Sequence, residues 1–212
     1  MMKKSKRSDV DPFIVMDVME SARIAEEKGK DIIHMEVGQP GTPAPKIAKD
    51  YITNEINKNN LGYTVSLGLP SLRTKISKLY GDWYNLDLNP NRIVVTTGSS
   101  GAFILSFSAL FDSGDRVGIG SPSYPSYRQI LKSLSLETVD IQTKLQNRFQ
   151  PVPEDITNNN LNGILVASPA NPTGSMLDKQ SLENLINTAN ENNVSFISDE
   201  IYHGIQYENN PT

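Results

Sequence analysis

The sequence predicts an α/β fold that is built on a mostly parallel, doubly wound sheet. Two short apolar runs, Gly163–Ala167 and Val194–Ser198, have the length of buried parallel strands, and polar residues follow each of them. Between them, Leu177–Asn192 carries leucine, isoleucine and alanine at helical spacing. This β-α-β unit would bind a ligand where its strands end. We therefore expect Asn171 and Asp199, which follow the two strands, to face one bound molecule.

The composition narrows the class of protein. The 212 residues suffice for one sizeable domain or two small ones. A net charge of −4 gives no basic footprint for nucleic acid, and no apolar run reaches the roughly 20 residues of a membrane helix. The sequence contains no cysteine, so disulfides and thiolate metal sites are excluded. A reducing compartment is permitted, and we expect a cytoplasmic location. The two histidines, His34 and His203, have no partners at metal-ligand spacing, so we expect no metal.

The first third of the chain is predicted to alternate helices with extended segments. Asp11 and Pro12 are typical of a helix start, and the apolar stripe that follows runs to about Lys28, where Gly29 would end the helix. Asp31–Val37 is predicted as a strand, followed by a turn that contains Gly38. Ala44–Asn57 is predicted as a helix, and Pro70 begins another.

A candidate anion site follows the predicted strand Arg92–Thr96. The motif TGSSGA begins at Thr97 and leads into an apolar helix that extends to about Phe111. The backbone N–H groups and the positive dipole end of a helix N-terminus attract anions, and the Ser99 and Ser100 hydroxyls add donors. The alternative is that these serines only cap the helix. Neither the G-x-G-x-x-G nor the Walker pattern is present, so dinucleotide and ATP sites are not indicated.

Two more strands, Arg116–Gly120 and Leu136–Ile141, are predicted farther along the chain. The block SPSYPSY follows the first of them and contains two tyrosines, Tyr124 and Tyr127, of which Tyr127 is expected to be structural. No site is predicted in the polar stretch 147–162. Asp199 has an alternative interpretation as the N-cap of a helix that begins at Glu200.

Taken together, these motifs resemble those of the fold-type I, pyridoxal-phosphate-dependent aminotransferases of class I/II. The motif SPANPTG at Ser168–Gly174 and the motif DEIY at Asp199–Tyr202 form a specific pair, although N-P-T-G alone would be a weak signal. The block Y-T-x-x-x-G-x-x-x-L-R occurs at Tyr63–Arg73. The matches extend in the family's order from about Glu36 to Tyr202.

The resemblance implies a role for each of these residues. Asp199 would hold the proton on the pyridine nitrogen of pyridoxal 5'-phosphate, and Asn171 and Tyr202 would donate to its phenolic oxygen. Gly38 and Asn171 would lie near the substrate carboxylate. Tyr124 would stack on the pyridine ring. The cofactor phosphate would be bound by Gly98, Ser99 and Ser100. The protein would be a homodimer, and the partner's Tyr63 would reach across the interface to the same phosphate.

The resemblance also implies how the chain is organised. Residues 1–43 would form an N-terminal arm and a segment of the small domain, and residues 44–212 an incomplete large domain. The family's reactive lysine lies in an S-x-x-K block that we expect beyond Thr212, since no lysine follows Lys179. We therefore assign no catalytic residue within the chain and expect the 212-residue segment alone to be inactive.

The implied reaction moves an amino group between an amino acid and a 2-oxo acid. The motifs concern the cofactor, so another fold-type I enzyme such as a β-elimination lyase stays open, as does a non-catalytic fragment. A regulator with an aminotransferase-like domain would need an N-terminal DNA-binding module, and only a short tail precedes Asp11.

Overall fold

The computed structural model describes residues 3–39 and 41–205, and it divides the chain into two compact units. One, here called the sheet unit, comprises Met1–Phe13 and Thr97–Thr212, and the other, the helical unit, comprises Ile14–Thr96. The predicted domain division at residues 43 and 44 stays a prediction. In the part of the chain that the structure describes, no helix has the length and apolar character that crossing a membrane requires.

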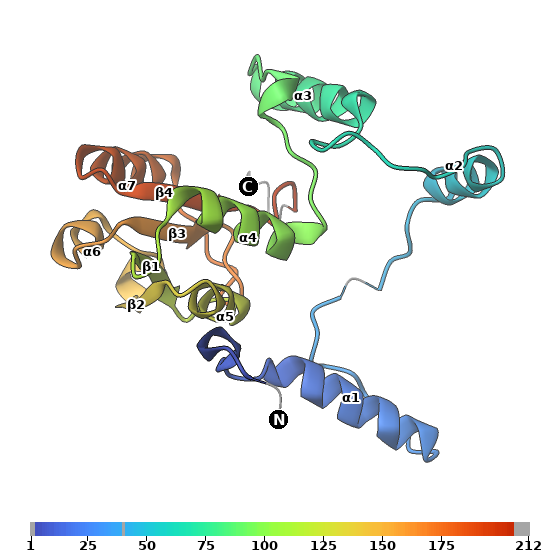
Figure 1. Ribbon diagram of the computed structural model, residues 1–212, viewed down its shortest axis with the longest axis horizontal. Helices are drawn as coiled ribbons and strands as arrows, with labels where there is room; N and C mark the ends of the chain where they lie inside the picture. The colour runs from blue at the N-terminus through green and yellow to red at the C-terminus, as the bar shows by residue number, and fades with distance from the viewer. Residues whose placement is uncertain (1–2, 40, 206–212) are drawn as a thin grey trace. The chain divides into compact units, whose positions relative to one another are not determined.

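The sheet unit contains four parallel strands (Figure 1): β1 (Arg116–Ser121), β2 (Glu137–Gln142), β3 (Gly163–Ala167) and β4 (Ser195–Asp199). The order is β2-β1-β3-β4, so β4 lies at one edge of this sheet. The sequence predicted all four strands to within one residue at each end, because each is a short β-branched or apolar run between turn residues. The predicted parallel α/β sheet is confirmed.

Helices cover both faces of the sheet (Figure 1). One face packs against α4 (Gly98–Leu110) and α5 (Ser126–Ser133), and the other against α6 (Pro153–Asn158) and α7 (Lys179–Glu191). Successive strand side chains point to opposite faces. Each face therefore has its own apolar core: Phe103, Phe107, Val117, Ile119, Tyr127, Leu131 and Leu165 on one side, and Ile141, Ile156, Ile164, Val166, Leu185 and Ala189 on the other.

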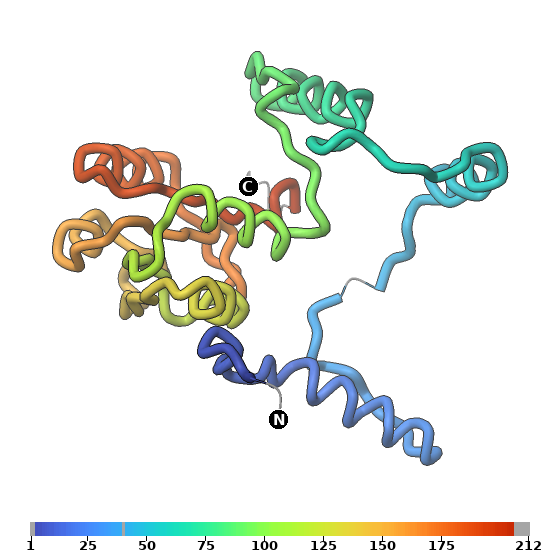
Figure 2. Tube along the Cα trace, viewed as in Figure 1, coloured from blue at the N-terminus to red at the C-terminus, as the bar shows by residue number. Residues whose placement is uncertain are grey.

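The N-terminal segment of the sheet unit lies beside α5, as Figure 2 shows in dark blue and yellow. The side-chain amide of Gln129 donates to the carbonyl oxygens of Asp11 and Pro12 at 3.1 and 3.3 Å. The Phe13 ring meets the Tyr124 ring edge-on, with centroids 5.8 Å apart. Residues 11–13 therefore pack against α5 and the segment that precedes it.

The helical unit contains α1 (Ile14–Glu27), α2 (Lys46–Ile56) and α3 (Pro70–Tyr84). All three helices were predicted, although α1 begins two residues later than Pro12. Gly29 adopts a φ of +81° just after α1, a conformation that glycine reaches without a Cβ clash. Arg73 of α3 is buried, and its guanidinium donates to the carbonyl oxygens of Gly68 and Pro90.

Two predicted strands, Asp31–Val37 and Arg92–Thr96, were wrong. Within the described residues neither segment has a ladder partner, and the Val95 N–H donates to the Leu67 carbonyl at 3.0 Å outside any sheet. Strand propensity reflects packing against neighbouring strands, so β-branched residues without a partner do not form a strand. Ile33 and Met35 are accordingly more than four-fifths exposed. Short helices α5 and α6 were not predicted.

Candidate active site

The carboxyl ends of β3 and β4 meet at one edge of the sheet. Ala167, the last residue of β3, is the register partner of Asp199, the last residue of β4. The Ser168 N–H then donates to the Asp199 carbonyl at 3.2 Å. The loop that carries Asn171 therefore leaves the sheet directly beside Asp199. This is the edge where open α/β sheets bind their ligands.

The Asp199 carboxylate is buried at this edge, with 8% of the residue exposed. One of its oxygens, Oδ2, accepts a hydrogen bond from the Tyr127 hydroxyl, and Oδ1 accepts one from the Ile201 N–H at 3.1 Å. Residues 201–204 form a turn, so the alternative role of Asp199 as a helix N-cap is wrong. A buried carboxylate needs such donors, because an unpaired charge in the interior is strongly destabilising.

Tyr127, expected from the sequence to be structural, donates a hydrogen bond from its hydroxyl to the Asp199 carboxylate. It is 1% exposed, and its ring meets those of Phe103 and Tyr124 nearly at right angles, with centroids 5.3 and 5.4 Å away. Burial first, and then the hydrogen bond to Asp199, raises the pKa of the Tyr127 hydroxyl well above its ordinary value. The hydroxyl therefore keeps its proton and acts as a donor.

The predicted anion site begins at Gly98, the first residue of α4, whose φ is +74°. Thr97 occupies the N-cap position and makes no side-chain cap bond. Ser99 and Ser100 therefore lie inside the first turn of the helix, and both are exposed. Apart from its chain neighbours and its own helix backbone, no atom of the described residues lies within 4 Å of where a Cβ on Gly98 would stand. The first turn of a helix presents N–H donors and the positive dipole end to an anion.

The loop that carries Asn171 is held by a buried glutamine. Gln150 is 3% exposed, and its amide nitrogen donates to the carbonyl oxygens of Ala167 and Ser175, each at 3.1 Å, and to Ser175 Oγ at 3.3 Å. Within the loop, the Ala170 N–H donates to the Ser175 carbonyl at 2.9 Å. No sequence motif pointed to Gln150, which lies in a polar stretch where no site was predicted.

A small cavity of about 20 Å³ lies under this edge of the sheet and is lined by Tyr127, Gln150 and Asn171, among others. Tyr127, which bonds to Asp199, thus lines the same cavity as Asn171. Tyr202 lies in the turn after β4 and is half-buried. Gly38 and Tyr63 belong to the helical unit, so their place at the site stays a prediction.

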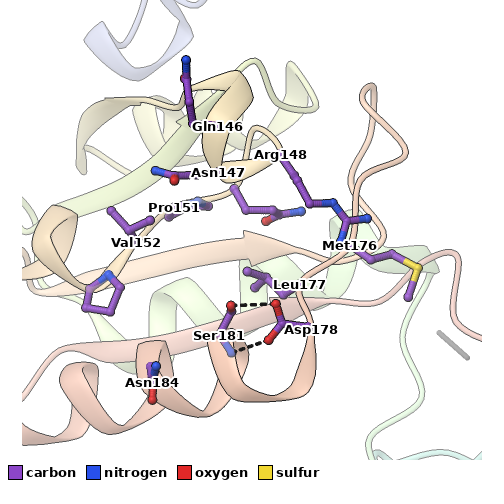
Figure 3. A pocket seen from close by; sticks show the side chains of 12 residues that line it. Gln146, Asn147, Arg148, Pro151, Val152, Met176, Leu177, Asp178, Ser181 and Asn184 are labelled. Carbon is purple, nitrogen blue, oxygen red and sulfur yellow. Dashed lines mark hydrogen bonds between the residues drawn. The ribbon is translucent and has the colours of Figure 1, made fainter. Parts of the chain in front are cut away.

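A larger cavity, of about 240 Å³, opens between the segment 146–153 and the start of α7 (Figure 3). None of the predicted site residues lines it. Its one carboxylate, Asp178, is engaged as the N-cap of α7, because it accepts bonds from the N–H and the hydroxyl of Ser181 at 2.8 and 2.9 Å. We therefore place the candidate active site at the strand ends. Among the described residues, no three histidine, aspartate or glutamate side chains gather as a metal site would require.

Comparison with known proteins places these motifs in context. The family described as aminotransferase class I and II matches residues 30–211. The valine–pyruvate aminotransferase of Mycobacterium tuberculosis is 41% identical over 207 residues, which cover 97% of this chain and 53% of that protein.

Two solved structures cover the whole chain. An aminotransferase from Mycobacterium tuberculosis is 39% identical with a TM-score of 0.94, and 55% of its chain is matched. A Silicibacter pomeroyi protein that is provisionally named an aminotransferase is 57% identical with a TM-score of 0.88, and 54% of its chain is matched. The present chain thus spans about half the length of these relatives.

Proposed function

Because the chain belongs to the aminotransferase class I and II family, we propose that it forms the cofactor-binding half of a pyridoxal-phosphate-dependent aminotransferase. The proposed reaction transfers an amino group between an amino acid and a 2-oxo acid. The observation that carries this proposal is the buried Asp199 carboxylate at the edge where β3 and β4 end, beside the loop of Asn171.

The described residues fit the chemistry of pyridoxal 5'-phosphate. A carboxylate oxygen has two lone pairs, so the Asp199 oxygens that accept bonds from Tyr127 and Ile201 can each accept one more, from a ring N–H. The first turn of α4 begins with Gly98 and offers space, N–H groups and two serine hydroxyls to a phosphate. These two features supply an acceptor for one end of the cofactor and donors for the other.

When bound, pyridoxal phosphate supplies an electron sink for the α-carbon of an amino acid. The residues of this chain would prepare that chemistry. Asp199 would hold the proton at the ring nitrogen, while Asn171 and Tyr202 would donate to the phenolic oxygen and favour its ionised form. Tyr124 would cover the ring, and the first turn of α4, with Ser99 and Ser100, would hold the phosphate.

The proposal also includes features that the contacts described above do not involve. The family resemblance supports a reactive lysine in residues that follow Thr212, a homodimer, and a Tyr63 that serves the site of the partner subunit. Gly38 and Asn171 would lie near the substrate carboxylate. The relative from Mycobacterium tuberculosis is named for valine and pyruvate, so this pair is the first to assay. We also propose a cytoplasmic location, which the lack of cysteine supports.

The test uses the full-length protein as its gene encodes it, with valine and pyruvate and then a panel of amino and 2-oxo acids. We expect a new 2-oxo acid without free ammonia, and Asp199→Ala should lower the turnover by about 10²–10³-fold, as the loss of a preorganised electrostatic partner does. Glu191→Ala, which removes an exposed carboxylate at the end of α7, is the matched control. Release of ammonia without amino transfer would favour a β-elimination lyase instead.

A further inference from the structure

Tyr127 connects three parts of the candidate site. Its hydroxyl bonds to Asp199 at the end of β4, and its ring meets Phe103 of α4, the helix whose first turn is the candidate phosphate site. It also meets Tyr124, which would cover the cofactor ring. The buried Tyr127 side chain therefore contacts residues of β4, of α4 and of the segment before α5.

We propose that Tyr127 is a positioning residue that fixes the orientation of the Asp199 carboxylate towards the ring nitrogen of the cofactor. This inference rests on the proposed function. The Tyr127 hydroxyl donates to Oδ2 and the Ile201 N–H donates to Oδ1, so each carboxylate oxygen has its own donor. A carboxylate that is held at both oxygens cannot rotate freely about its Cβ–Cγ bond. Its remaining lone pairs thus keep fixed directions.

The hydroxyl is the informative part of this side chain. A phenylalanine at position 127 would keep the ring contacts with Phe103 and Tyr124 and would bury the same apolar surface. The hydroxyl donates a hydrogen bond to Asp199, which is 72 residues away in sequence. Burial makes each such polar contact matter more, because the Asp199 carboxylate, at 8% exposure, has little access to water to replace a lost donor.

The experiment compares two probes on the full-length protein as its gene encodes it. Pyridoxamine 5'-phosphate has the ring nitrogen but no aldehyde, so it binds without a covalent bond to lysine. Its analogue with a C–H group in place of the ring nitrogen keeps the phosphate and the shape. We expect Tyr127→Phe to weaken the calorimetric Kd for pyridoxamine phosphate by about tenfold, the size of one hydrogen bond to a charged group. The Kd for the analogue should stay within about twofold of wild type.

A double-mutant cycle separates positioning from general packing. In an Asp199→Asn background, Tyr127→Phe should cause no further loss of affinity for pyridoxamine phosphate, because the group through which it acts is already changed. Tyr51→Phe removes an exposed hydroxyl from α2 and should leave both dissociation constants unchanged. A thermal melt of each variant without ligand checks that it folds.

The outcomes are distinct. Equal weakening for both probes, or the same loss in both backgrounds, would mean that Tyr127 only supports packing and would overturn the proposal, as would an unchanged Kd. If the wild-type protein binds neither probe, the proposed function itself fails. Where Tyr127→Phe does not fold, the low-field hydroxyl proton of Tyr127 provides a second measurement by NMR. We expect this resonance in the wild-type protein and not in Asp199→Asn, and its absence from the wild type would contradict the inference.

Discussion

The side-chain amide of Gln150 donates to the carbonyl oxygen of Ser175 at 3.1 Å, and this bond closes the loop that carries Asn171. The same nitrogen donates to the carbonyl of Ala167, where the loop leaves β3. The buried side-chain amide of Gln150 thus hydrogen-bonds to both ends of the loop between Ala167 and Ser175.

Replacing Gln150 by leucine should therefore destabilise the protein. The change removes the Gln150 donor from the half-buried carbonyl oxygens of Ala167 and Ser175, and the Ser175 oxygen keeps its bond from the Ala170 N–H. We expect a loss of about 0.5–1.5 kcal/mol for each hydrogen bond removed. Chemical denaturation measures the free energy of unfolding. Gln180→Leu is the control, because Gln180 is exposed on α7 and bonds only to the neighbouring side chain of Asn184. Equal stabilities for both variants would show that the Gln150 bonds carry no weight.

In the helical unit, His34 should titrate above the ordinary range of histidine. Its Nδ1 lies 2.7 Å from a Glu36 carboxylate oxygen and its Nε2 lies 2.9 Å from one of Glu26. The bond to Glu36 first, and then that to Glu26, raises the pKa of His34 to about 9. Because the folded pKa exceeds the unfolded one of about 6.5, the added stability is fully present below pH ~6.5 and is lost as the pH rises through about 9.

NMR titration of the His34 ring protons measures this directly, since His203 is the only other histidine in the sequence. The midpoint should lie near pH 9 and should fall in Glu36→Gln. Glu27→Gln is the matched control, because Glu27 pairs with Arg23 and not with His34. A wild-type midpoint close to 6.5 would contradict the assignment of these two ion pairs.

Gly163→Ala should destabilise the sheet unit. A Cβ at this position of β3 would overlap the Cζ atom of the Phe111 ring, closer than real contacts allow. Overpacking of this kind costs about 1–3 kcal/mol, which denaturation will measure. Phe111→Leu in the same chain should return part of the loss. Gly62→Ala, at a position with no atom within 4 Å of the new Cβ, should change the stability little. A neutral Gly163→Ala would refute the steric account.

Complementation between two inactive variants tests whether Tyr63 serves the partner subunit. Tyr63→Ala and Asp199→Ala proteins should each show low transaminase activity. A mixed dimer would contain one site with an intact Asp199 and an intact Tyr63 from the partner subunit, so mixing under exchange conditions should restore activity. Light scattering of the same samples reports the oligomeric state. If Tyr63 acts within its own subunit, every mixed site lacks one of the two groups and no activity returns.

The features that the sequence predicted well are local ones. Gly163–Ala167 is an uninterrupted apolar run between turn residues, and Leu177–Asn192 carries apolar residues at helical spacing, so both could be placed without knowing their neighbours. Arg92–Thr96 has the composition of a strand, but a strand also requires a partner, and partners are set by distant parts of the chain. Gly98, Ser99 and Ser100 were placed at a helix start for the same local reasons.

The two polar residues that the sequence did not single out act over long separations. Tyr127 bonds to a residue 72 positions away, and Gln150 to residues 17 and 25 positions away. A tyrosine in a loop and a glutamine in a polar stretch are usually exposed or half-buried, so composition gives no reason to select them. Only the fold, which brings α5 and the 145–152 segment against the ends of β3 and β4, identifies their partners.

The contact between the segment that contains Asp11 and Phe13 and helix α5 forms late relative to the synthesis of that segment. This contact joins Asp11 to Gln129, which are 118 positions apart, so it cannot form until α5 has been synthesised. At roughly 5–20 residues per second, the ribosome needs about 6–24 s to make the intervening chain. During that interval the Phe13 side chain has no Tyr124 to cover it. The Phe13 ring therefore gains its edge-on contact with Tyr124 only after the chain around α5 has been made.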